Sequence, residues 1–387
     1  MRLGLIGVGQ GGGSVVDRFV ARNEWSSHKS VLPFTIAINT AKSDLMGLKN
    51  VPMDSRVLIG QTRVKGHGAG GNPDLGARVA EEDIHFIKRA ISRHGTHNID
   101  AFLVIAGMGG GTGSGGSSII ARALKESYSE PVYALALLPS EDEGQLMAFN
   151  AAKSLHNMSE EADAIFLWDN QIWQSSGLSM KDTYIEMNNR IVDPFLTLLG
   201  AGEVTSSSRV GVKVVDASDI IYSTTGYVTM GYSGWQKSSV AVVKDVGKKI
   251  LPFLKRHSVQ DLDPTTRCFS LIQDAANGML SSECNYASAT KAMFIVSGTP
   301  SEISRQGIDK ARVWLEQVTA GAEVRGGDYP MPMSKSLSSV VMFSGLHEIE
   351  VINRLTEKAK MVEKLRAKKS NGSFRKKEPI TPKSWGV

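Results

Sequence analysis

The chain has 387 residues, of which 41% are hydrophobic and 21% charged, a composition typical of soluble globular proteins. Its length suffices for two domains, because single hydrophobic cores stop growing at roughly 250 to 300 residues. No apolar run reaches the ~18 residues that a membrane span requires, and the first residues lack the layout of a secretory signal peptide. With only Cys268 and Cys284, the sequence predicts no disulfide framework and a location in a reducing cytoplasm.

The net charge of +5 is unevenly distributed. From Lys358 to the end there are ten Lys and Arg against two Asp and Glu, which leaves 34 against 37 in the first 357 residues. The chain is therefore a near-neutral body with a basic tail. Because a nucleic-acid-binding domain would carry a basic face within its fold, no specific nucleic-acid partner is expected.

The first half of the sequence alternates apolar strands with helices. Strands are predicted at 2–8, 33–40, 55–60, 101–107, 131–139 and 163–170, and helices at 14–22, 73–91 and 117–127. This alternation indicates an α/β domain with a parallel sheet covered on both faces. Ligands of such sheets bind beyond the carboxyl ends of the strands.

The second half has a different pattern. A helix is predicted over 185–203, with a kink at Pro194 if that residue lies inside it. Strands at 227–235, 290–298 and 336–346, with helices at 263–280 and 303–318, predict a smaller α+β domain. A helix at 347–369 has one apolar face, and the last fifteen residues are expected to be disordered. The predicted units are 1–184, a connecting segment 185–226, 227–346, and the basic tail 347–387.

The stretch GMGGGTGSGGSS, residues 107–118, joins a predicted buried strand to a helix. Successive backbone N–H groups in a glycine-rich turn can converge on a phosphate, and a helix N-terminus adds favourable partial charge. Thr112 and Ser114 would add hydroxyl donors. A tight turn alone would need only one or two glycines, so the pattern favours a phosphate site.

Two further glycine clusters occur in similar settings. GVGQGGGS at 7–14 matches the G-x-G-x-x-G dinucleotide fingerprint, but the second strand ends in Asn39 and Thr40 instead of the ribose-binding acid. GHGAGGNPDLG occupies 66–76, and the P-loop pattern G-x-x-x-x-G-K-[ST] is absent. Three such loops on one sheet edge indicate a polyphosphate, whose charge backbone amides, hydroxyls and Mg²⁺ would meet.

GGGTGSG at 109–115 resembles the signature of the tubulin and FtsZ superfamily. The resemblance extends over residues 1 to about 350. The phrases VVDASDI, LPSEDEG and FLWDN are most similar to the archaeal cell-shape tubulins of the CetZ family. This resemblance implies the tubulin/FtsZ fold, namely a Rossmann-like GTPase domain, a central connecting helix and a smaller α+β domain, with GTP or GDP as the bound nucleotide.

The resemblance also implies roles for individual residues. The first loop would cradle the diphosphate, the signature loop the phosphates, and the third loop would sense the γ-phosphate. The matching positions are Gln10, Gly11, Gly12, Gly13 and Ser14, then Gly109, Gly110, Gly111, Thr112, Gly113 and Ser114, then Ala69, Gly70, Gly71 and Asn72.

On the nucleoside side, the resemblance assigns Glu143 to the ribose, Asn170 and Asn188 to guanine, and Tyr184 to stacking on the base. An amide can offer both a donor and an acceptor to the purine edge. Asn189 is the alternative to Asn188, and Tyr184 could instead belong to the core.

Asn39 lies in the second loop, where Ala41 replaces the acid that FtsZ carries after Asn-Thr, so a carboxylate near Mg²⁺ is missing or supplied by Asp44. No protein-bound metal is expected elsewhere, because His94 and His97 have no further ligands nearby in the sequence.

No general base accompanies the loops. The resemblance implies that a neighbouring subunit completes the site, with Asp219 as the principal catalytic acid and Asp216 as its companion. Composition alone would make Asp216 a helix cap.

The sequence is thus interpreted as a cytoplasmic GTPase that assembles head to tail into protofilaments and controls cell shape. The alternatives are a nucleotide-dependent scaffold with little hydrolysis and a dinucleotide-dependent oxidoreductase. The basic tail would either contact acidic partners or an anionic membrane surface, or be a solvated end.

Overall fold

The computed structural model describes residues 1–24, 31–172, 180–201, 215–236, 262–331, 334 and 336–370, without the side chains of 180–184, 236 and 368–370. The end of the helix expected over 185–203 and the last fifteen residues lie outside this part of the chain.

The N-terminal half is built on the parallel sheet that the alternating pattern predicts. Its strands lie in the order β3-β2-β1-β4-β5-β6, and each neighbouring pair is parallel. Their bounds are β1 Leu3–Val8, β2 Phe34–Asn39, β3 Arg56–Leu58, β4 Ala101–Gly107, β5 Val132–Leu138 and β6 Ala164–Asp169. The strands are continuous apolar runs because both faces of this sheet are buried.

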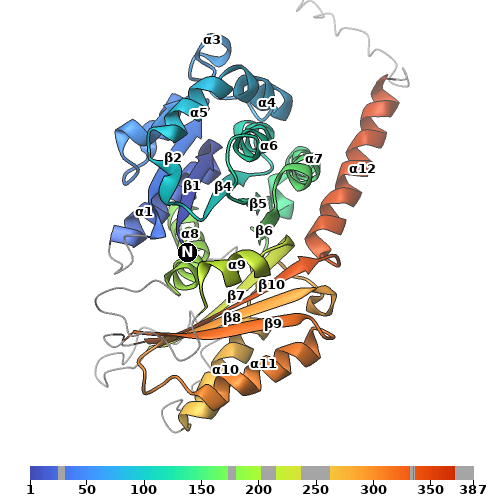
Figure 1. Cartoon of the computed structure of the whole chain (residues 1–387). Coiled ribbons are helices and arrows are strands. Elements are labelled where there is room, and N and C mark those ends of the chain that lie inside the picture. Colours follow the sequence, from blue (N-terminus) through green and yellow to red (C-terminus); the bar gives the residue numbers. More distant parts are fainter. Residues whose placement is uncertain are drawn as a thin grey trace, which may run out of the picture.

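Helices cover both faces of this sheet (Figure 1). Their bounds are α1 Gly9–Glu24, α2 Lys42–Gly47, α3 Gln61–Val64, α4 Pro73–Glu82, α5 Ile84–Ser92, α6 Thr112–Lys125 and α7 Gln145–Glu161. Successive strand residues face opposite sides: Ile6 packs with α4, α6 and α7, whereas Leu5 packs with α1. The expected two-sided covering is therefore confirmed.

Four details differ from the sequence-based expectation. Helix α1 starts at Gly9 and not at Ser14, so most of the first glycine cluster forms its first turns. The single helix predicted over 73–91 is broken at Asp83, whose carboxylate accepts a hydrogen bond from the backbone N–H of Gly60 at 2.6 Å. Helix α6 starts at Thr112 and not at Ser117, so residues 112–118 of the glycine-rich stretch form its first two turns. Helix α7 was not predicted, although Ala148, Ala151, Leu155 and Met158 form a buried stripe along it.

Helix α8, Met180–Gly200, connects the two halves and contains Pro194 within a single helix. It packs against α1, where Phe195 meets Phe19 with ring centroids 5.9 Å apart. A short helix α9, Ala217–Ser223, leads into the second half.

The second half continues the same sheet. Its strands are β7 Gly226–Gln236, β8 Lys291–Gly298, β9 Glu323–Pro330 and β10 Ser336–Leu346, and its helices are α10 Pro264–Asn277 and α11 Arg305–Val318. The start of β7 pairs in parallel with the start of β6, and the order continues β7-β10-β8-β9, giving a ten-stranded sheet in the described residues. Strand β9 was not predicted because Gly326 and Gly327 interrupt it. A Cβ on Gly326 would lie 2.1 Å from the ring of Phe294, so the glycine makes room for that side chain.

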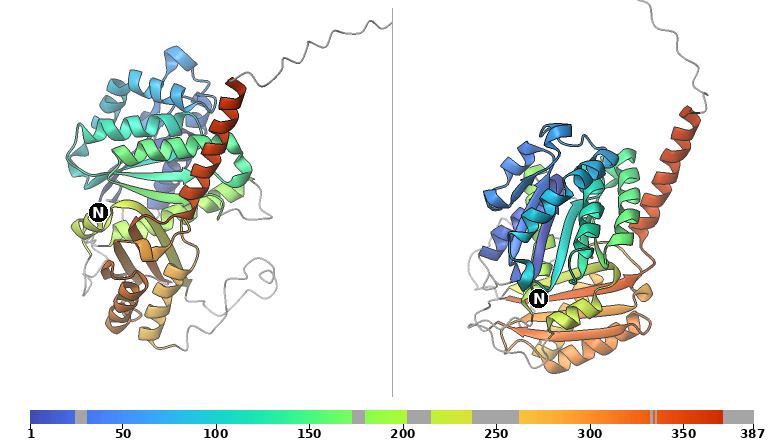
Figure 2. Two further views of the ribbon diagram at one scale, coloured as in Figure 1. Left: turned by 90° about the vertical axis from the view of Figure 1, so that its right-hand side faces the viewer. Right: turned by 45° about the horizontal axis from the view of Figure 1, so that its top comes forward.

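Helix α12, Glu350–Ser370, is the expected helix with one apolar face. Val351, Leu355 and Val362 are buried on it, and Leu365 one turn later is exposed. The helix runs along α7, as Figure 2 shows, and near its end the Arg366 guanidinium still lies over the Phe149 ring of α7, 4.4 Å from its centroid. None of the helices in the described part of the chain combines the length and apolarity needed to cross a bilayer.

Candidate functional site

Three glycine-rich segments meet at the carboxyl ends of the parallel strands. The register places Val8 of β1 beside Ala106 of β4, so the loops that follow both strands leave the sheet together. A Cβ on Gly9 would lie 2.9 Å from the backbone N of Gly113. On the other side, a Cβ on Gly111 would lie 2.9 Å from the N of Asn72. The segments 9–14, 109–115 and 69–72 therefore touch backbone to backbone and form one cradle.

The cradle offers backbone donors and open space. Helices α1 and α6 both begin in it, and the first N–H groups of a helix have no acceptor within that helix. A Cβ built on Gly70, Gly71 or Gly110 would meet no other atom of the chain within 4 Å. An anion could therefore approach the peptide groups of two loops without displacing a side chain.

The two loop hydroxyls have partners within the chain. The Ser114 hydroxyl donates to the carbonyl oxygens of Gly110 and Gly111, its own preceding turn. The Thr112 hydroxyl lies 2.6 Å from the hydroxyl of Thr40, at the end of β2. Both side chains are buried. The cradle surface is thus made mainly of peptide groups, and these hydroxyls hold its loops in shape.

Asn150 of α7 holds two of the loops together and was missed in the sequence. Its amide Nδ2 donates to the carbonyl oxygen of Gly71 at 3.1 Å and to that of Gly109 at 2.9 Å. One turn later, Ser154 donates to the carbonyl oxygen of Ser114 at 2.6 Å. Both side chains are buried. A polar residue beside the buried stripe of α7 was the available signal, but the helix itself had not been recognised.

The third loop is closed by its own helix cap. The Asn72 side chain accepts hydrogen bonds from the N–H groups of Asp74 and Leu75 at the start of α4. Asn39, in the second loop, accepts from the N–H of Ala41 and donates to the Asp44 carboxylate at 3.0 Å. Asp44 is therefore the carboxylate that the structure brings to the second loop, where a magnesium ion on the phosphates could use it.

The two residues expected at the ribose and at guanine meet at the ends of β5 and β6. The Glu143 carboxylate accepts a hydrogen bond from the backbone N–H of Ser140 at 2.9 Å. The Asn170 amide donates to the same carboxylate oxygen at 3.4 Å. Glu143 is exposed and Asn170 is half-buried. The signature loop follows β4, the neighbour of β5 in the sheet.

Helix α8 brings Asn188 to the first loop. Its Nδ2 lies 3.5 Å from the carbonyl oxygen of Ser14, whereas the side chain of Asn189 accepts a hydrogen bond from Arg18 of α1. Of the two asparagines, Asn188 is thus the one directed at the cradle. Tyr184 belongs to α8, but its side chain lies outside the described part of the chain.

Asp216 and Asp219 lie at the opposite edge of the sheet from the cradle. They precede β7, whose first residue Gly226 pairs in parallel with Ala164, the first residue of β6. The acids are therefore at the amino ends of the strands, about 20 Å from the loops, because a strand rises ~3.3 Å per residue. In Figure 1, α9 lies close to the N-terminus of the chain.

Both acids have partners within the chain. Asp216 caps α9 by accepting from the N–H of Asp219 at 2.9 Å, and Asp219 accepts in return from the N–H of Asp216 at 3.3 Å. Asp219 also forms an ion pair with Arg325 of β9, which contacts Glu323 at 3.2 Å. Desolvation disfavours the charged guanidinium, but the hydrogen bonds that it donates to Asp219 and Glu323, together with their negative charges, outweigh this effect, so the pKa of Arg325 is raised.

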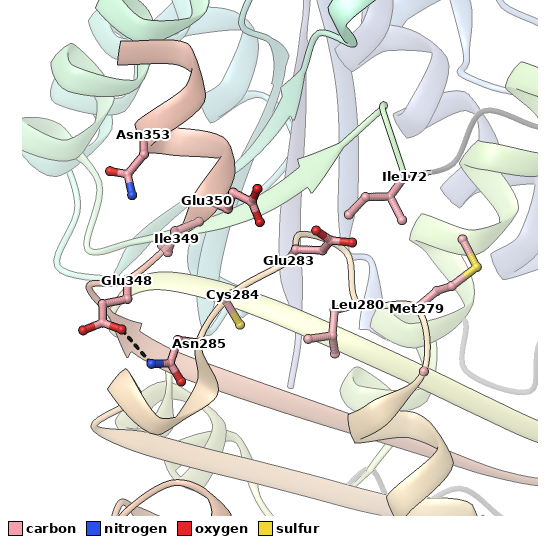
Figure 3. Close-up of a pocket in the computed structure, with 11 residues that line it drawn as sticks. Ile172, Met279, Leu280, Glu283, Cys284, Asn285, Glu348, Ile349, Glu350 and Asn353 are labelled. Carbon is pink, nitrogen blue, oxygen red and sulfur yellow. Dashed lines mark hydrogen bonds between the residues drawn. The ribbon is translucent and has the colours of Figure 1, made fainter. Parts of the chain in front are cut away.

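A cavity of about 630 Å³ lies elsewhere, at the start of α12 (Figure 3). Leu280, Ile349 and Met279 supply apolar walls, and Glu283, Glu348 and Glu350 lie around them. None of its lining residues belongs to the glycine loops. In the described residues, no group of three His, Cys, Asp or Glu side chains could hold a metal ion.

Comparison with known proteins identifies both halves of the chain. The family model "Tubulin/FtsZ family, GTPase domain" matches residues 2–177, and the model "Tubulin-like CetZ, C-terminal domain" matches residues 177–361. The chain is 42% identical to the tubulin-like protein CetZ1 of Haloferax volcanii over 366 residues, covering 93% of this chain and 92% of that protein.

Two solved structures have the same fold. The GDP-bound CetZ1 monomer of Haloferax volcanii superimposes with a TM-score of 0.81 at 38% identity, over 94% of this chain and all of that one. The GTPγS-bound CetZ2 protofilament of Haloferax volcanii also has a TM-score of 0.81, at 34% identity, over 95% of this chain and all of that one. The fold class expected from the sequence is thereby confirmed.

Proposed function

This chain belongs to the CetZ family of tubulin-like proteins, and from that premise we propose that it binds GTP and GDP in the glycine cradle and hydrolyses GTP in head-to-tail protofilaments. The observation that carries the proposal is the cradle itself. Three segments distant in the sequence meet backbone to backbone, and their glycines leave open space in front of the peptide groups. The solved relatives, one with GDP and one with GTPγS, support a guanine nucleotide as the ligand. With the family established, the oxidoreductase alternative is set aside.

The phosphates would contact the peptide groups of the three loops. Magnesium would be held through the phosphates, with Asp44 beside Asn39 as the nearest carboxylate of the second loop. The magnesium ion would neutralise phosphate charge, since no lysine lies within the three glycine clusters. The residues proposed here are Gln10, Gly11, Gly12, Gly13, Ser14, Asn39, Ala69, Gly70, Gly71, Asn72, Gly109, Gly110, Gly111, Thr112, Gly113 and Ser114.

The nucleoside would lie between the end of β6 and α8. Glu143 offers a carboxylate to the ribose hydroxyls, and Asn170, hydrogen-bonded to it, is placed to read the base. Asn188 faces the first loop and is proposed as the second amide that reads guanine. Tyr184, one turn earlier on α8, is proposed to stack on the base.

Hydrolysis is proposed to need a second copy of the chain. Asp216 and Asp219 cannot reach the cradle of their own chain because they lie at the other edge of the sheet. When copies stack head to tail, that edge meets the cradle of the next copy, and Asp219 can orient the attacking water. A heterologous contact of this kind repeats indefinitely, so it builds open filaments instead of closed dimers. The protofilament of the CetZ2 relative supports this arrangement.

The tail has a separate proposed role. Lys364 and Arg366 are exposed near the end of α12, and from Lys364 to the end the sequence has eight Lys and Arg against one Glu. We propose that the cytoplasmic filament, acting in control of cell shape, contacts acidic partners or an anionic membrane surface through this end. Co-sedimentation of the full chain with vesicles containing phosphatidylserine should occur at low salt and be lost at high salt. Equal binding to vesicles of neutral lipid would exclude the electrostatic contact.

The proposed GTPase is tested by identifying the nucleotide released from denatured, freshly purified protein, and then by measuring phosphate release at several protein concentrations. We expect guanine nucleotide, and turnover per subunit that rises with protein concentration, because only stacked copies have a complete site. Turnover per subunit that stays constant over that range would favour hydrolysis within one chain. Guanine binding without any turnover would favour the scaffold alternative.

A further inference from the structure

A buried carboxylate lies directly beside the proposed base-reading residue. Asp169 ends β6 immediately before Asn170, and it is 2% exposed. One of its oxygens accepts the N–H of Gln171 at 3.0 Å, and the other accepts from the Arg354 guanidinium of α12 at 2.7 Å. An ionised carboxylate at such a depth requires a partner of this kind, because an unpaired buried charge is costly.

Arg354 and its neighbour on α12 also reach the loop that carries the proposed ribose ligand. The Arg354 Nε lies 3.7 Å from the Glu141 carboxylate, and Lys358 Nζ lies 3.5 Å from the same oxygen. Glu141 opens the short helical turn Glu141–Glu143. The backbone N–H of Glu141 donates to the side chain of Gln171 at 2.8 Å. Helix α12 thus contacts two separate segments, the loop after β5 through Glu141 and the end of β6 through Asp169.

The segment after α10, in the second half of the chain, also holds the end of β6. The backbone N–H of Asp169 donates to the carbonyl oxygen of Ser281 at 2.8 Å, in the segment that follows α10. That segment lines the cavity of Figure 3, together with Ile172 after β6 and Asn353 beside Arg354. The end of β6 is therefore held by elements of the second half, whereas the phosphate cradle is held by α1, α4, α6 and α7.

We propose that Arg354 is a positioning residue for the nucleoside half of the nucleotide site. Binding of guanine nucleotide is then coupled to the packing of residues 350–358 of α12 against the loops after β5 and β6. The proposal rests on the proposed function of the cradle. Arg354 does not contact the nucleotide; it fixes Asp169 and Glu141, and through them the loops that carry Asn170 and Glu143. By linkage, a nucleotide that orders these loops must stabilise the α12 contact by the same factor.

The test compares GDP and ADP binding in the full chain and in two variants. Arg354→Met keeps the length of the side chain and removes its charge, and Arg354→Lys keeps the charge and removes the forked geometry. We expect Arg354→Met to weaken GDP binding about tenfold, within the usual range of coupling between sites, with a reduced preference for GDP over ADP. Arg354→Lys should give a smaller loss. Lys360→Met, an exposed position of α12 paired with Glu357, is the matched control and should bind GDP as the wild type does.

A readout that a purely structural role would not move is hydrogen–deuterium exchange of residues 350–358. In the wild type, GDP should slow exchange in this segment, and ADP should not. In Arg354→Met, the effect of GDP should be lost even at saturating nucleotide.

The outcomes separate the inference from the function. Wild-type GDP affinity in folded Arg354→Met, or α12 exchange that is indifferent to GDP, overturns the positioning role and leaves the GTPase proposal intact. A wild type that binds neither GDP nor GTP overturns both. If Arg354→Met does not fold, the Arg354→Lys affinity and the wild-type exchange data decide the question.

Discussion

The two edges of the parallel sheet are built in opposite ways. At the carboxyl edge, peptide groups and glycines form a tightly packed cradle. A Cβ atom added to Gly9 or Gly111 would lie only 2.9 to 3.1 Å from backbone nitrogens of a neighbouring loop. At the amino edge, the functional groups are charged side chains. Asp216 and Asp219 are partly exposed, and Arg325 forms an ion pair with Asp219. A cradle made of backbone is complete in one chain, whereas exposed acids can act on a neighbour. The comparison predicts that binding and turnover can be separated by mutation.

The largest effect is expected at the amino edge. Asp219→Ala should lower GTP turnover by about 100-fold or more, since removal of a group that positions or deprotonates water typically costs 10²–10⁴, while GTP affinity stays unchanged. Steady-state phosphate release and equilibrium binding measure the two quantities. Asp309→Ala, an exposed acid of α11, is the control and should leave both unchanged. A loss of affinity in Asp219→Ala would remove the distinction between the edges.

The next effect is expected at the carboxyl edge, where Gly111→Ala places a methyl group 2.9 Å from the N of Asn72 and 3.0 Å from the Cβ of Ala69. Overpacking of this kind costs about 1–3 kcal/mol of the free energy of unfolding, and we expect GTP affinity to fall with it. Denaturant unfolding and nucleotide binding provide the measurements.

Substitution of the neighbouring Gly110 separates the effect on stability from the effect on nucleotide binding. A Cβ on Gly110 meets no atom of the chain within 4 Å, so Gly110→Ala should keep wild-type stability and lose only nucleotide affinity. Equal affinity in Gly110→Ala would show that the open space in front of this residue is not where the phosphates bind.

A smaller effect is expected at Asn150, which links two loops of the cradle from α7. Asn150→Asp removes both donated hydrogen bonds without changing the size of the side chain, and leaving buried groups unsatisfied costs about 1–3 kcal/mol. Unfolding free energy should fall and GTP dissociation should accelerate. His156→Ala, exposed on the same helix, should change neither. Wild-type dissociation in Asn150→Asp would mean that the loops hold their shape without the link.

The smallest effect is expected at Arg325. Exposed ion pairs contribute about 0.2–1 kcal/mol, so Arg325→Ala should change the critical concentration for assembly and the turnover at most about fivefold. Light scattering and phosphate release at increasing salt would measure this, and the difference from wild type should shrink as salt screens the pair. A turnover as low as that of Asp219→Ala would place Arg325 in the chemistry itself.

Much of the fold could be predicted from local patterns. Buried parallel strands are unbroken apolar runs, and glycine clusters between a strand and a helix are typical of phosphate-binding loops. The sheet and its three loops could therefore be predicted from the sequence. Helix α7 and strand β9 were not. In β9 the glycines that weaken the strand pattern are there for Phe294, a residue distant in the sequence. The division of the chain into domains stays a prediction, because one sheet runs through both halves.

In the candidate site, too, some features could be predicted from the sequence and others only from the folded structure. Each of the three glycine-rich segments of the cradle is encoded in contiguous residues, because a turn with no side chains is a local property. Side-chain partners depend on contacts across the chain. Asn150 bonding two loops and Arg354 holding Asp169 became visible only in the folded molecule. Asn188 was already the first choice from the sequence, and the structure adds its contact with Ser14. Which edge of the sheet carries the acids likewise follows from strand pairing, since no spacing along the chain reveals that Gly226 lies beside Ala164.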